Sequence, residues 1–446
     1  MIAEDVSEAG HERPLRRIFG NLAWLVGGKG FGAVCSLVYL AILSRSLGLR
    51  DFGHFSLIFG TAQAIVALAG FQTWQAVVRF GTPHLAAERW GAVSRIALLA
   101  GLIDAAGALL GSLIAFVCLF VFAGQLSLNP DFTTMAFIFI CVFVCARGSA
   151  PLGILRLFDR YDLAVKAGAF APAARLLAAT LIWLTGPSVG RFLFAWASIE
   201  IVTFGLYWTL ALRRRPGALS LPGPGHWRGA LAENPGILRF MGITYCASSA
   251  QAVLQQGPLL AVGYLLGTSA AGAYRLADQL ARGLSKLSGL MAQALYPEVN
   301  RQHHAATAAQ FRKLVVRLSL MVLAVGPVVV AIAYFLGDDL LALIGGSEFA
   351  RAGAVLVPLA VAASIDLAGV SYESVLHSTG RTAWPLYARL LAIVALGVGI
   401  TLFAGIGSVG LGWAVALATA AGYLVTSGMV AFALRRMDAP GTPVTR

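Results

Sequence analysis

One apolar stretch, residues 270–296, carries four charged side chains at helical spacing. Arg275, Asp278, Arg282 and Lys286 follow one another at intervals of three, four and four residues. At about 100° per residue, such side chains fall on one stripe of a helix. The stripe either faces a water-filled cavity or forms a local ladder of ion pairs, with Asp278 neutralising an arginine. Because one acid cannot neutralise three bases, the pattern favours a cationic cavity wall.

Lys29 is a second candidate, because it lies inside an apolar stretch among closely spaced glycines. The glycines do not have the spacing of a phosphate-binding loop, and no strand precedes them. Either the glycines pack against another helix while Lys29 reaches back to the membrane surface, or Lys29 faces a cavity. The surface is about 12 Å away at 1.5 Å per residue, so we predict a cavity-facing lysine. Arg147 and Arg175 add positive charge to the same half of the chain.

Acidic residues inside apolar stretches are the candidates for binding a coupling ion. They are Asp104, Glu200, Asp278, Asp366 and Glu373. Such carboxylates bind a coupling proton or Na⁺, or they pair with the basic residues, and the sequence leaves both roles open. Cys141 and Cys145 are one helical turn apart with no third ligand nearby, so we expect no metal site. No cofactor and no catalytic residue is expected.

The elements that position these residues are membrane-spanning helices. Hydrophobic residues make up 58% of the 446 residues and charged residues only 12%, against roughly 25% charged in soluble domains. Spans need about 20 apolar residues. Twelve are predicted, at 21–44, 53–75, 94–124, 132–155, 164–186, 190–212, 237–265, 270–296, 313–337, 351–378, 383–404 and 408–434. Pro172, Pro258, Pro327 and Pro358 fall within spans and are expected to kink them.

Lysine and arginine are concentrated on alternate loops, which predicts the orientation of the chain. The loops 125–131, 266–269, 338–350 and 405–407 contain neither residue. The basic side is cytoplasmic by the positive-inside rule. The tails 1–20 and 435–446 and the loop 213–236 are therefore expected in the cytoplasm. The net charge of +13 reflects this topology, so no nucleic-acid partner is expected.

Short matches between the two halves indicate an internal duplication. Leu47-Gly48 recurs as Leu266-Gly267, and Ser188-Val189-Gly190 recurs as Ser408-Val409-Gly410. The matches predict two six-helix lobes, residues 21–212 and 237–434, joined by 213–236. Because six is even, the lobes have the same orientation and a pseudo-twofold axis along the membrane normal. This all-α architecture places a central cavity between the lobes.

Three runs resemble bacterial polysaccharide flippases, which export the repeat units of O-antigen and capsule. They are YLAILSRSLGLRDFGHFSL (39–57), ILRLFDRYDLA (154–164) and AGAYRLADQL…YPEVNRQ (271–302). These flippases belong to the multidrug/oligosaccharidyl-lipid/polysaccharide exporter superfamily. The resemblance implies a V-shaped bundle that alternates between cytoplasmic and periplasmic openings and moves oligosaccharides on a polyprenyl pyrophosphate. It also implies basic residues at Lys29 and along the eighth span, which suit a pyrophosphate.

The expected function is therefore transport of a lipid-linked glycan in surface polysaccharide biosynthesis. The expected location is the bacterial inner membrane, as a monomer, with a polysaccharide polymerase and chain-length machinery as possible partners and H⁺ or Na⁺ as a possible coupling ion. A multidrug cation antiporter would share the fold, but its cavity should be acidic or aromatic. A glycan polymerase or ligase is disfavoured by the short outer loops.

Overall fold

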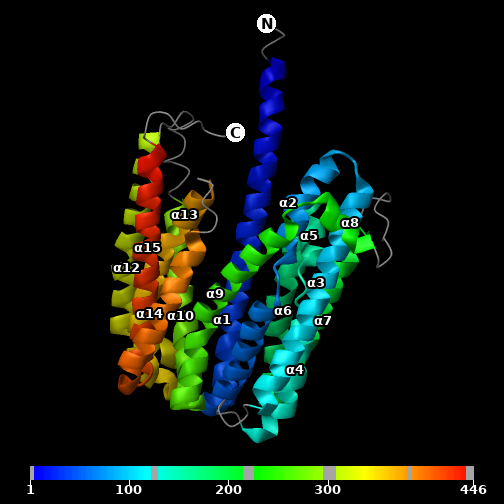
Figure 1. Ribbon diagram of the computed structural model, residues 1–446. Coiled ribbons are helices and arrows are strands. Elements are labelled where there is room, and N and C mark those ends of the chain that lie inside the picture. The colour runs from blue at the N-terminus through cyan, green and yellow to red at the C-terminus, as the bar shows by residue number, and fades with distance from the viewer. Residues whose placement is uncertain (1–4, 122–128, 214–225, 295–307, 379–383, 438–446) are drawn as a thin grey trace. The chain divides into compact units, whose positions relative to one another are not determined.

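The computed structural model describes residues 5–121, 129–213, 226–294, 308–378 and 384–437 (Figure 1). Side chains are described for 30–121, 129–213, 226–285, 325–369 and 384–433, and for Tyr372 and Leu376. Every regular element in these ranges is helical, so the predicted all-α fold is confirmed.

Each predicted span corresponds to a helix or to a pair of helices. In the first half the helices are α1 (Asp5–Ala69), α2 (Thr73–Ala86), α3 (Trp90–Phe116), α4 (Thr133–Cys145), α5 (Ala150–Leu157), α6 (Tyr161–Thr185), α7 (Val189–Arg213) and α8 (Trp227–Glu233). In the second half they are α9 (Ile237–Leu266), α10 (Thr268–Ala294), α12 (Ala308–Gly345), α13 (Gly353–Ser378), α14 (Trp384–Phe403) and α15 (Ser408–Met437). Short π- and 3₁₀-turns cover Val117–Val121, Pro130–Phe132, Ser347–Ala352 and Ala404–Ile406.

Nine helical segments among the described residues are long and apolar enough to cross a membrane. The chain is therefore a multi-pass membrane protein. One of these segments, 30–86, covers parts of both of the first two predicted spans, and α9 and α10 are not among the nine. The total of twelve spans stays a prediction.

Interruptions of the helices fall at small and polar residues. The backbone of α1 leaves helical geometry at Gly48, where φ is +72°. The second predicted span is broken between α1 and α2, and the fourth is broken between α4 and α5. The four prolines expected to kink spans lie inside helices that continue through them, and the kinks stay a prediction.

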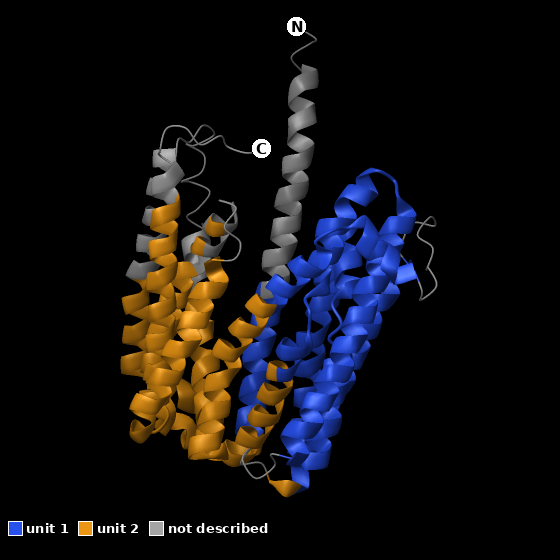
Figure 2. Cartoon of the chain, in the orientation of Figure 1, with its two compact units in different colours: residues 1–46, 65–121, 131–245 blue, residues 47–64, 122–130, 246–446 orange. Residues whose placement is uncertain are grey.

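The described chain forms two compact units, shown in blue and orange in Figure 2. Unit 1 contains residues 1–46, 65–121 and 131–245. Within it α3 packs against α2, α4, α5 and α8, and α7 packs against α4, α5 and α6. Its apolar core includes Val77, Ile96, Leu155 and Met241, each less than 5% exposed.

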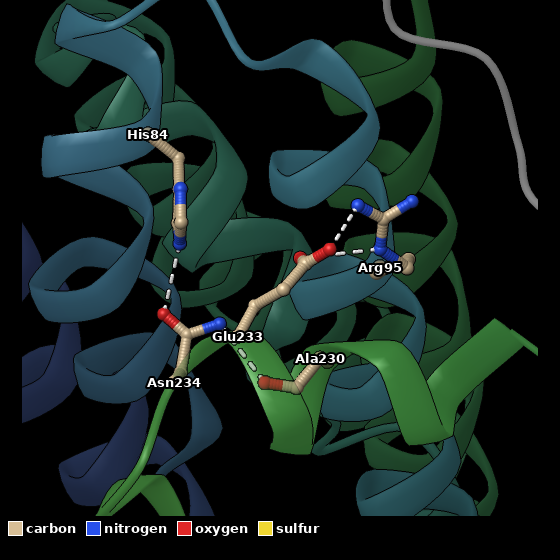
Figure 3. A network of polar contacts seen from close by, with 5 residues as sticks. All are labelled: His84, Arg95, Ala230, Glu233 and Asn234. Atoms are coloured by element: carbon tan, nitrogen blue, oxygen red, sulfur yellow. Dashed lines mark hydrogen bonds and ion pairs between the residues drawn. The ribbon is translucent and has the colours of Figure 1, made fainter.

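The predicted linker 213–236 contains a short helix, α8, that docks on unit 1. Arg95 of α3 forms an ion pair with Glu233, and Nε2 of His84 lies 3.0 Å from Oδ1 of Asn234 (Figure 3). Asn234 also donates a hydrogen bond to the carbonyl of Ala230 at 2.9 Å. This end of the linker is therefore fixed to the ends of α2 and α3.

Unit 2 contains residues 47–64, 122–130 and 246–446, and so includes a part of α1. In this unit α13 packs against α10, α12 and α15, and α14 packs against α15. Gly53 of α1 and Gly272 of α10 face each other closely, because a Cβ built on Gly272 would lie 3.2 Å from the Cα of Gly53. Phe52 stacks edge-on against Phe349, with 5.7 Å between ring centroids.

The two positions matched by the duplication share their backbone geometry. Gly48 and Gly267 both have positive φ, +72° and +86°, a conformation that side chains with a Cβ rarely adopt. In the other matched pair, α7 begins at Val189 and α15 begins at Ser408. The matched segments therefore share local backbone features, and the duplication itself stays a prediction.

Candidate functional site

Unit 1 brings together one glutamate and two of the predicted basic residues. Arg147 Nε lies 3.2 Å from Glu200 Oε2, and Arg175 Nη2 lies 2.5 Å from Glu200 Oε1. The side chains of Glu200 and Arg175 are 6% and 10% exposed. Two positive charges thus share one negative charge inside the helical layer. We call Arg147, Arg175 and Glu200 the arginine–glutamate cluster.

Arg147 is the accessible member of this cluster. It lies in the non-helical link between α4 and α5, where the sequence Arg147-Gly148-Ser149 replaces a helical turn. Its side chain is 43% exposed, and its guanidinium stacks on the ring of Phe143 at 4.6 Å. The buried Arg175 lies 5.6 Å from the ring of Trp196. Arg147 can therefore present N–H donors to an anion while Arg175 holds Glu200.

Arg156 is a basic residue of unit 1 that the sequence analysis did not select. It lies in the last turn of α5, and its guanidinium stacks on Trp74 at 4.1 Å. Its Nε is buried and has no hydrogen-bond partner among the described residues. No sequence pattern indicates this placement, because Arg156 follows the fourth predicted span and counts among the basic residues of a predicted cytoplasmic loop.

Unit 2 places part of the predicted stripe on α10. Arg275 and Asp278 are buried, at 7% exposure each. Arg282 donates from Nε to Asp278 Oδ1 at 2.8 Å, an ion pair between residues four apart. Asp366 of α13 interacts electrostatically with Arg282. Among the described side chains, two bases of this unit are therefore accompanied by two acids. We call Arg275, Asp278, Arg282 and Asp366 the α10 cluster.

The remaining predicted site residues divide into one with a defined environment and three without. Asp104 of α3 accepts hydrogen bonds from the Thr73 hydroxyl and the Ala150 N–H, both at 2.8 Å. Lys29, Lys286 and Glu373 lie on α1, α10 and α13, but their side chains are outside the described residues. Their roles stay predictions.

The arrangement in unit 1 is suited to binding an anion. A guanidinium offers N–H donors in a planar fork that matches the oxygens of phosphate and carboxylate. The excess positive charge within a span is unfavourable in lipid and is met by water or by an anionic ligand. In the α10 cluster, by contrast, Arg282 already pairs with Asp278 and interacts electrostatically with Asp366.

Comparison with solved structures shows which class of proteins shares the fold of this chain. The chain has the fold of an inward-facing multidrug resistance MATE family transporter of the MOP superfamily (TM-score 0.67, 14% identity, 92% of this chain and 96% of that chain). It is similarly related to the lipid II flippase MurJ in an inward closed conformation (TM-score 0.66, 11% identity, 93% and 90%). The fold is therefore that of the MOP superfamily.

The sequence comparisons identify the family. The family model described as "Polysaccharide biosynthesis protein" matches residues 18–303. The chain belongs to this family. It is also 26% identical over 345 residues to the inner membrane protein YghQ of Escherichia coli K12, covering 76% of this chain and 95% of that protein. The resemblance predicted from the three sequence runs is confirmed by this family match.

Proposed function

We propose that the protein is a flippase. It moves polyprenyl-pyrophosphate-linked oligosaccharide repeat units from the cytoplasmic to the periplasmic leaflet by alternating access, for O-antigen, capsule or exopolysaccharide synthesis. The observation that carries this proposal is the arginine–glutamate cluster, in which Arg147 is accessible and the positive charge exceeds the negative. A pyrophosphate supplies the missing negative charge. The glycan part of the proposed substrate is inferred from the family, whose model is described as "Polysaccharide biosynthesis protein".

The proposal includes the topology and the lobes predicted from the sequence. The lobes are 21–212 and 237–434, and the tails and the 213–236 loop face the cytoplasm of a bacterium, with the protein in its inner membrane. A reporter that is active only in the periplasm should be silent when fused after Arg436 and active when inserted within 125–131. The reverse pattern would exclude the proposed direction of transport.

The central test is transport of a defined probe. Purified protein in liposomes should move a fluorescent polyprenyl-pyrophosphate disaccharide between leaflets without changing it. Elongation or transfer of the sugar would show an enzyme, such as a polymerase or ligase, instead of a transporter. This assay needs no partner such as a polymerase, because it follows only the movement of the probe from one leaflet to the other.

Arg147→Ala tests the role of the cluster in that assay. Glu200 keeps its partner Arg175 in this variant, so the protein should still fold, while an accessible cation is lost. We expect transport to fall about tenfold or more, since a hydrogen bond to a charged group contributes about 1.5–3 kcal/mol. Arg191→Ala is the matched control, because the guanidinium of Arg191 donates to the carbonyls of Thr185 and Gly186 at the end of α6. Equal rates in the two variants would remove Arg147 from the substrate site.

A multidrug cation antiporter is the second candidate, favoured by the shared fold with a MATE family transporter. Such a protein would move a lipophilic cation such as ethidium, and removal of a positive charge by Arg147→Ala should then leave transport unchanged or faster. The excess of arginine in the cluster argues against this candidate. Both probes are therefore measured on both variants.

A further inference from the structure

Two charged side chains of unit 2 are accessible in the middle of their helices. Asp366 lies thirteen residues after the start of α13 at Gly353 and twelve before its end at Ser378, and it is exposed. Arg282 lies fourteen residues after the start of α10 and twelve before its end, and its side chain is 35% exposed. At 1.5 Å per residue, each stands about 18 Å or more from either end of its helix. A charge at this depth is costly in lipid, so both side chains face water or a polar ligand.

The two side chains belong to one surface of unit 2. Helix α10 packs against α13, and Arg282 interacts electrostatically with Asp366. Gln279 lies one turn from Arg282 on α10 and is partly exposed. The residues one turn before and after Asp366 on α13 are Ala363 and Gly369, which are too small to shield the carboxylate. A carboxylate, a guanidinium and an amide are therefore accessible together. We call Gln279, Arg282 and Asp366 the unit 2 polar surface.

Among the described side chains, the charges at this surface are balanced, in contrast to those of the arginine–glutamate cluster. Arg282 donates to the buried Asp278 at 2.8 Å and also interacts with the exposed Asp366. An anion that approaches the guanidinium therefore also meets a carboxylate, and a cation that approaches the carboxylate meets the guanidinium. Neither gains a large net attraction. The surface favours a ligand that is uncharged and rich in hydrogen-bonding groups.

A sugar ring has these properties. Each of its hydroxyls can both donate and accept, and neighbouring hydroxyls lie side by side. A carboxylate presents two acceptor oxygens, a guanidinium presents donors in a planar fork, and a glutamine amide presents one acceptor and two donors. Hydrogen bonds to charged groups are the stronger ones, so Asp366 and Arg282 should contribute most. An acidic sugar would be repelled by Asp366, so the expected sugar is neutral.

We propose that Gln279, Arg282 and Asp366 form a recognition site for an uncharged sugar of the lipid-linked glycan. The proposal rests on the proposed transport function for the lipid-linked substrate, and it adds the group that the glycan contacts. Arg147 of unit 1 keeps its proposed role with the pyrophosphate. Loss of a sugar contact should therefore not weaken the binding of a lipid that carries no sugar.

The first experiment measures binding with matched probes. The purified protein in lipid nanodiscs is titrated with fluorescent polyprenyl pyrophosphate, and with the same lipid carrying glucose, galactose or mannose. The wild type should bind at least one sugar-bearing probe about tenfold more tightly than the bare lipid, as expected for hydrogen bonds to charged groups. Asp366→Asn replaces one acceptor oxygen by a donor, so it should bring this ratio of Kd values close to one without weakening the binding of the bare lipid. Asp339→Asn, the same change at an exposed acid of α12, is the matched control and should keep the wild-type ratio.

Two results of this titration would overturn the proposal. One is a wild-type ratio of one with all three sugars, and the other is a wild-type ratio in Asp366→Asn. A merely structural ion pair predicts the second result together with a lower temperature of thermal unfolding, because a loosened α10 should weaken both kinds of probe by the same factor. If Asp366→Asn cannot be purified, Gln279→Leu replaces it, since this uncharged change removes the amide from the same surface. A wild-type ratio in Gln279→Leu would then overturn the proposal.

The charge of the sugar is tested with one further probe. Polyprenyl pyrophosphate carrying glucuronic acid should bind the wild type less tightly than the glucose probe, and Asp366→Asn should reduce the difference. Tighter binding of the acidic probe would contradict an uncharged ligand.

Transport distinguishes failure of this proposal from failure of the proposed function. In liposomes, Asp366→Asn should move the bare lipid at the wild-type rate and should lose the preference for the sugar-bearing probe. If no protein, the wild type included, moves any probe, the flippase function fails, and the ratio of Kd values still decides the sugar site. If transport and its sugar preference are normal in Asp366→Asn, the flippase function stands and the sugar site fails.

Discussion

The charged residues of the two units are arranged differently. In unit 1, Arg147 and Arg175 both pair with the carboxylate of Glu200, and the fourth predicted span is broken at Arg147, between α4 and α5. In unit 2, the described bases of α10 are accompanied by Asp278 and Asp366, and α10 and α13 are continuous through these positions. Among the described residues, the two units therefore do not carry equivalent clusters. The excess charge and the broken backbone are found together in unit 1, which makes this unit the better candidate for binding an anion and for a change of conformation.

Removal of the shared acid should have the largest effect on stability. Glu200→Ala leaves two arginines without their partner, and breaking a buried pair in this way costs about 3–5 kcal/mol. Asp278→Ala should cost less, because the side chain of Arg282 is 35% exposed and Asp366 remains. Unfolding of the two purified variants in detergent measures the difference. Equal losses of stability in the two variants would show that the two clusters are equally shielded from solvent.

Removal of the bases predicted from the sequence should affect protein stability less than Glu200→Ala does, and should affect transport more. Lys29→Ala and Arg282→Ala remove charges from spans, where each charge costs about 2.5–3.5 kcal/mol at the centre. We expect insertion to be unharmed and export of surface polysaccharide to fall, with Lys29→Arg retaining more export than Lys29→Ala. If Arg282 is only a structural partner, its removal should lower protein abundance, and the added change Asp278→Ala should restore it. Normal export by folded alanine variants would exclude both bases from the substrate site.

Sequence patterns were sufficient to predict where the helices lie, but not where the spans are interrupted. An apolar run of about 20 residues predicts a span whatever its internal geometry, so most predicted spans agree closely with a helix, whereas the first two lie largely on one helix, α1, and α12 extends beyond both ends of the ninth. The interruptions before Thr73 and Ala150 depend on hydrogen bonds from a third helix, through Asp104, and no local pattern reports such a contact. Proline did not mark these interruptions, because α4 ends at Cys145, before Gly148 and Ser149, whereas α6 continues through Pro172.

The same limit applies to the charged residues. The stripe on α10 was visible because its members are three and four residues apart on one helix. In the arginine–glutamate cluster, Arg175 lies 28 positions and Glu200 lies 53 positions after Arg147 in the sequence. Only the fold brings these residues together. Each was still found as a charge within an apolar run. Arg156 was missed because its position at the end of a span gave it an ordinary topological role.

The close crossing in unit 2 should respond to a single methyl group. A Cβ at Gly53 would overlap the backbone of Thr268, so Gly53→Ala forces α1 and α10 apart, and overpacking of this kind costs about 1–3 kcal/mol. Gly428→Ala in α15 is the control, because nothing lies within 4 Å of its added Cβ. Thermal unfolding in detergent should show a loss for Gly53→Ala and none for Gly428→Ala. A neutral Gly53→Ala would mean that this crossing is not tightly packed.

The smallest effect is expected at α8, where unit 1 holds the linker. Arg95 and Glu233 are 27% and 35% exposed, and an exposed ion pair contributes about 0.2–1 kcal/mol that salt reduces (Figure 3). Glu233→Gln should therefore lower the free energy of unfolding by less than about 1 kcal/mol, and by less still at high salt. Asn234→Ala is the informative comparison, because Asn234 is 6% exposed and bonds both His84 and the carbonyl of Ala230. Its loss should be larger and less sensitive to salt, since the Asn234 side chain carries no charge and is shielded from solvent. If both variants lost the same free energy of unfolding, and salt reduced both losses, the ion pair would be the main stabilising interaction between α8 and unit 1. The buried amide of Asn234 would then contribute little to the docking of α8.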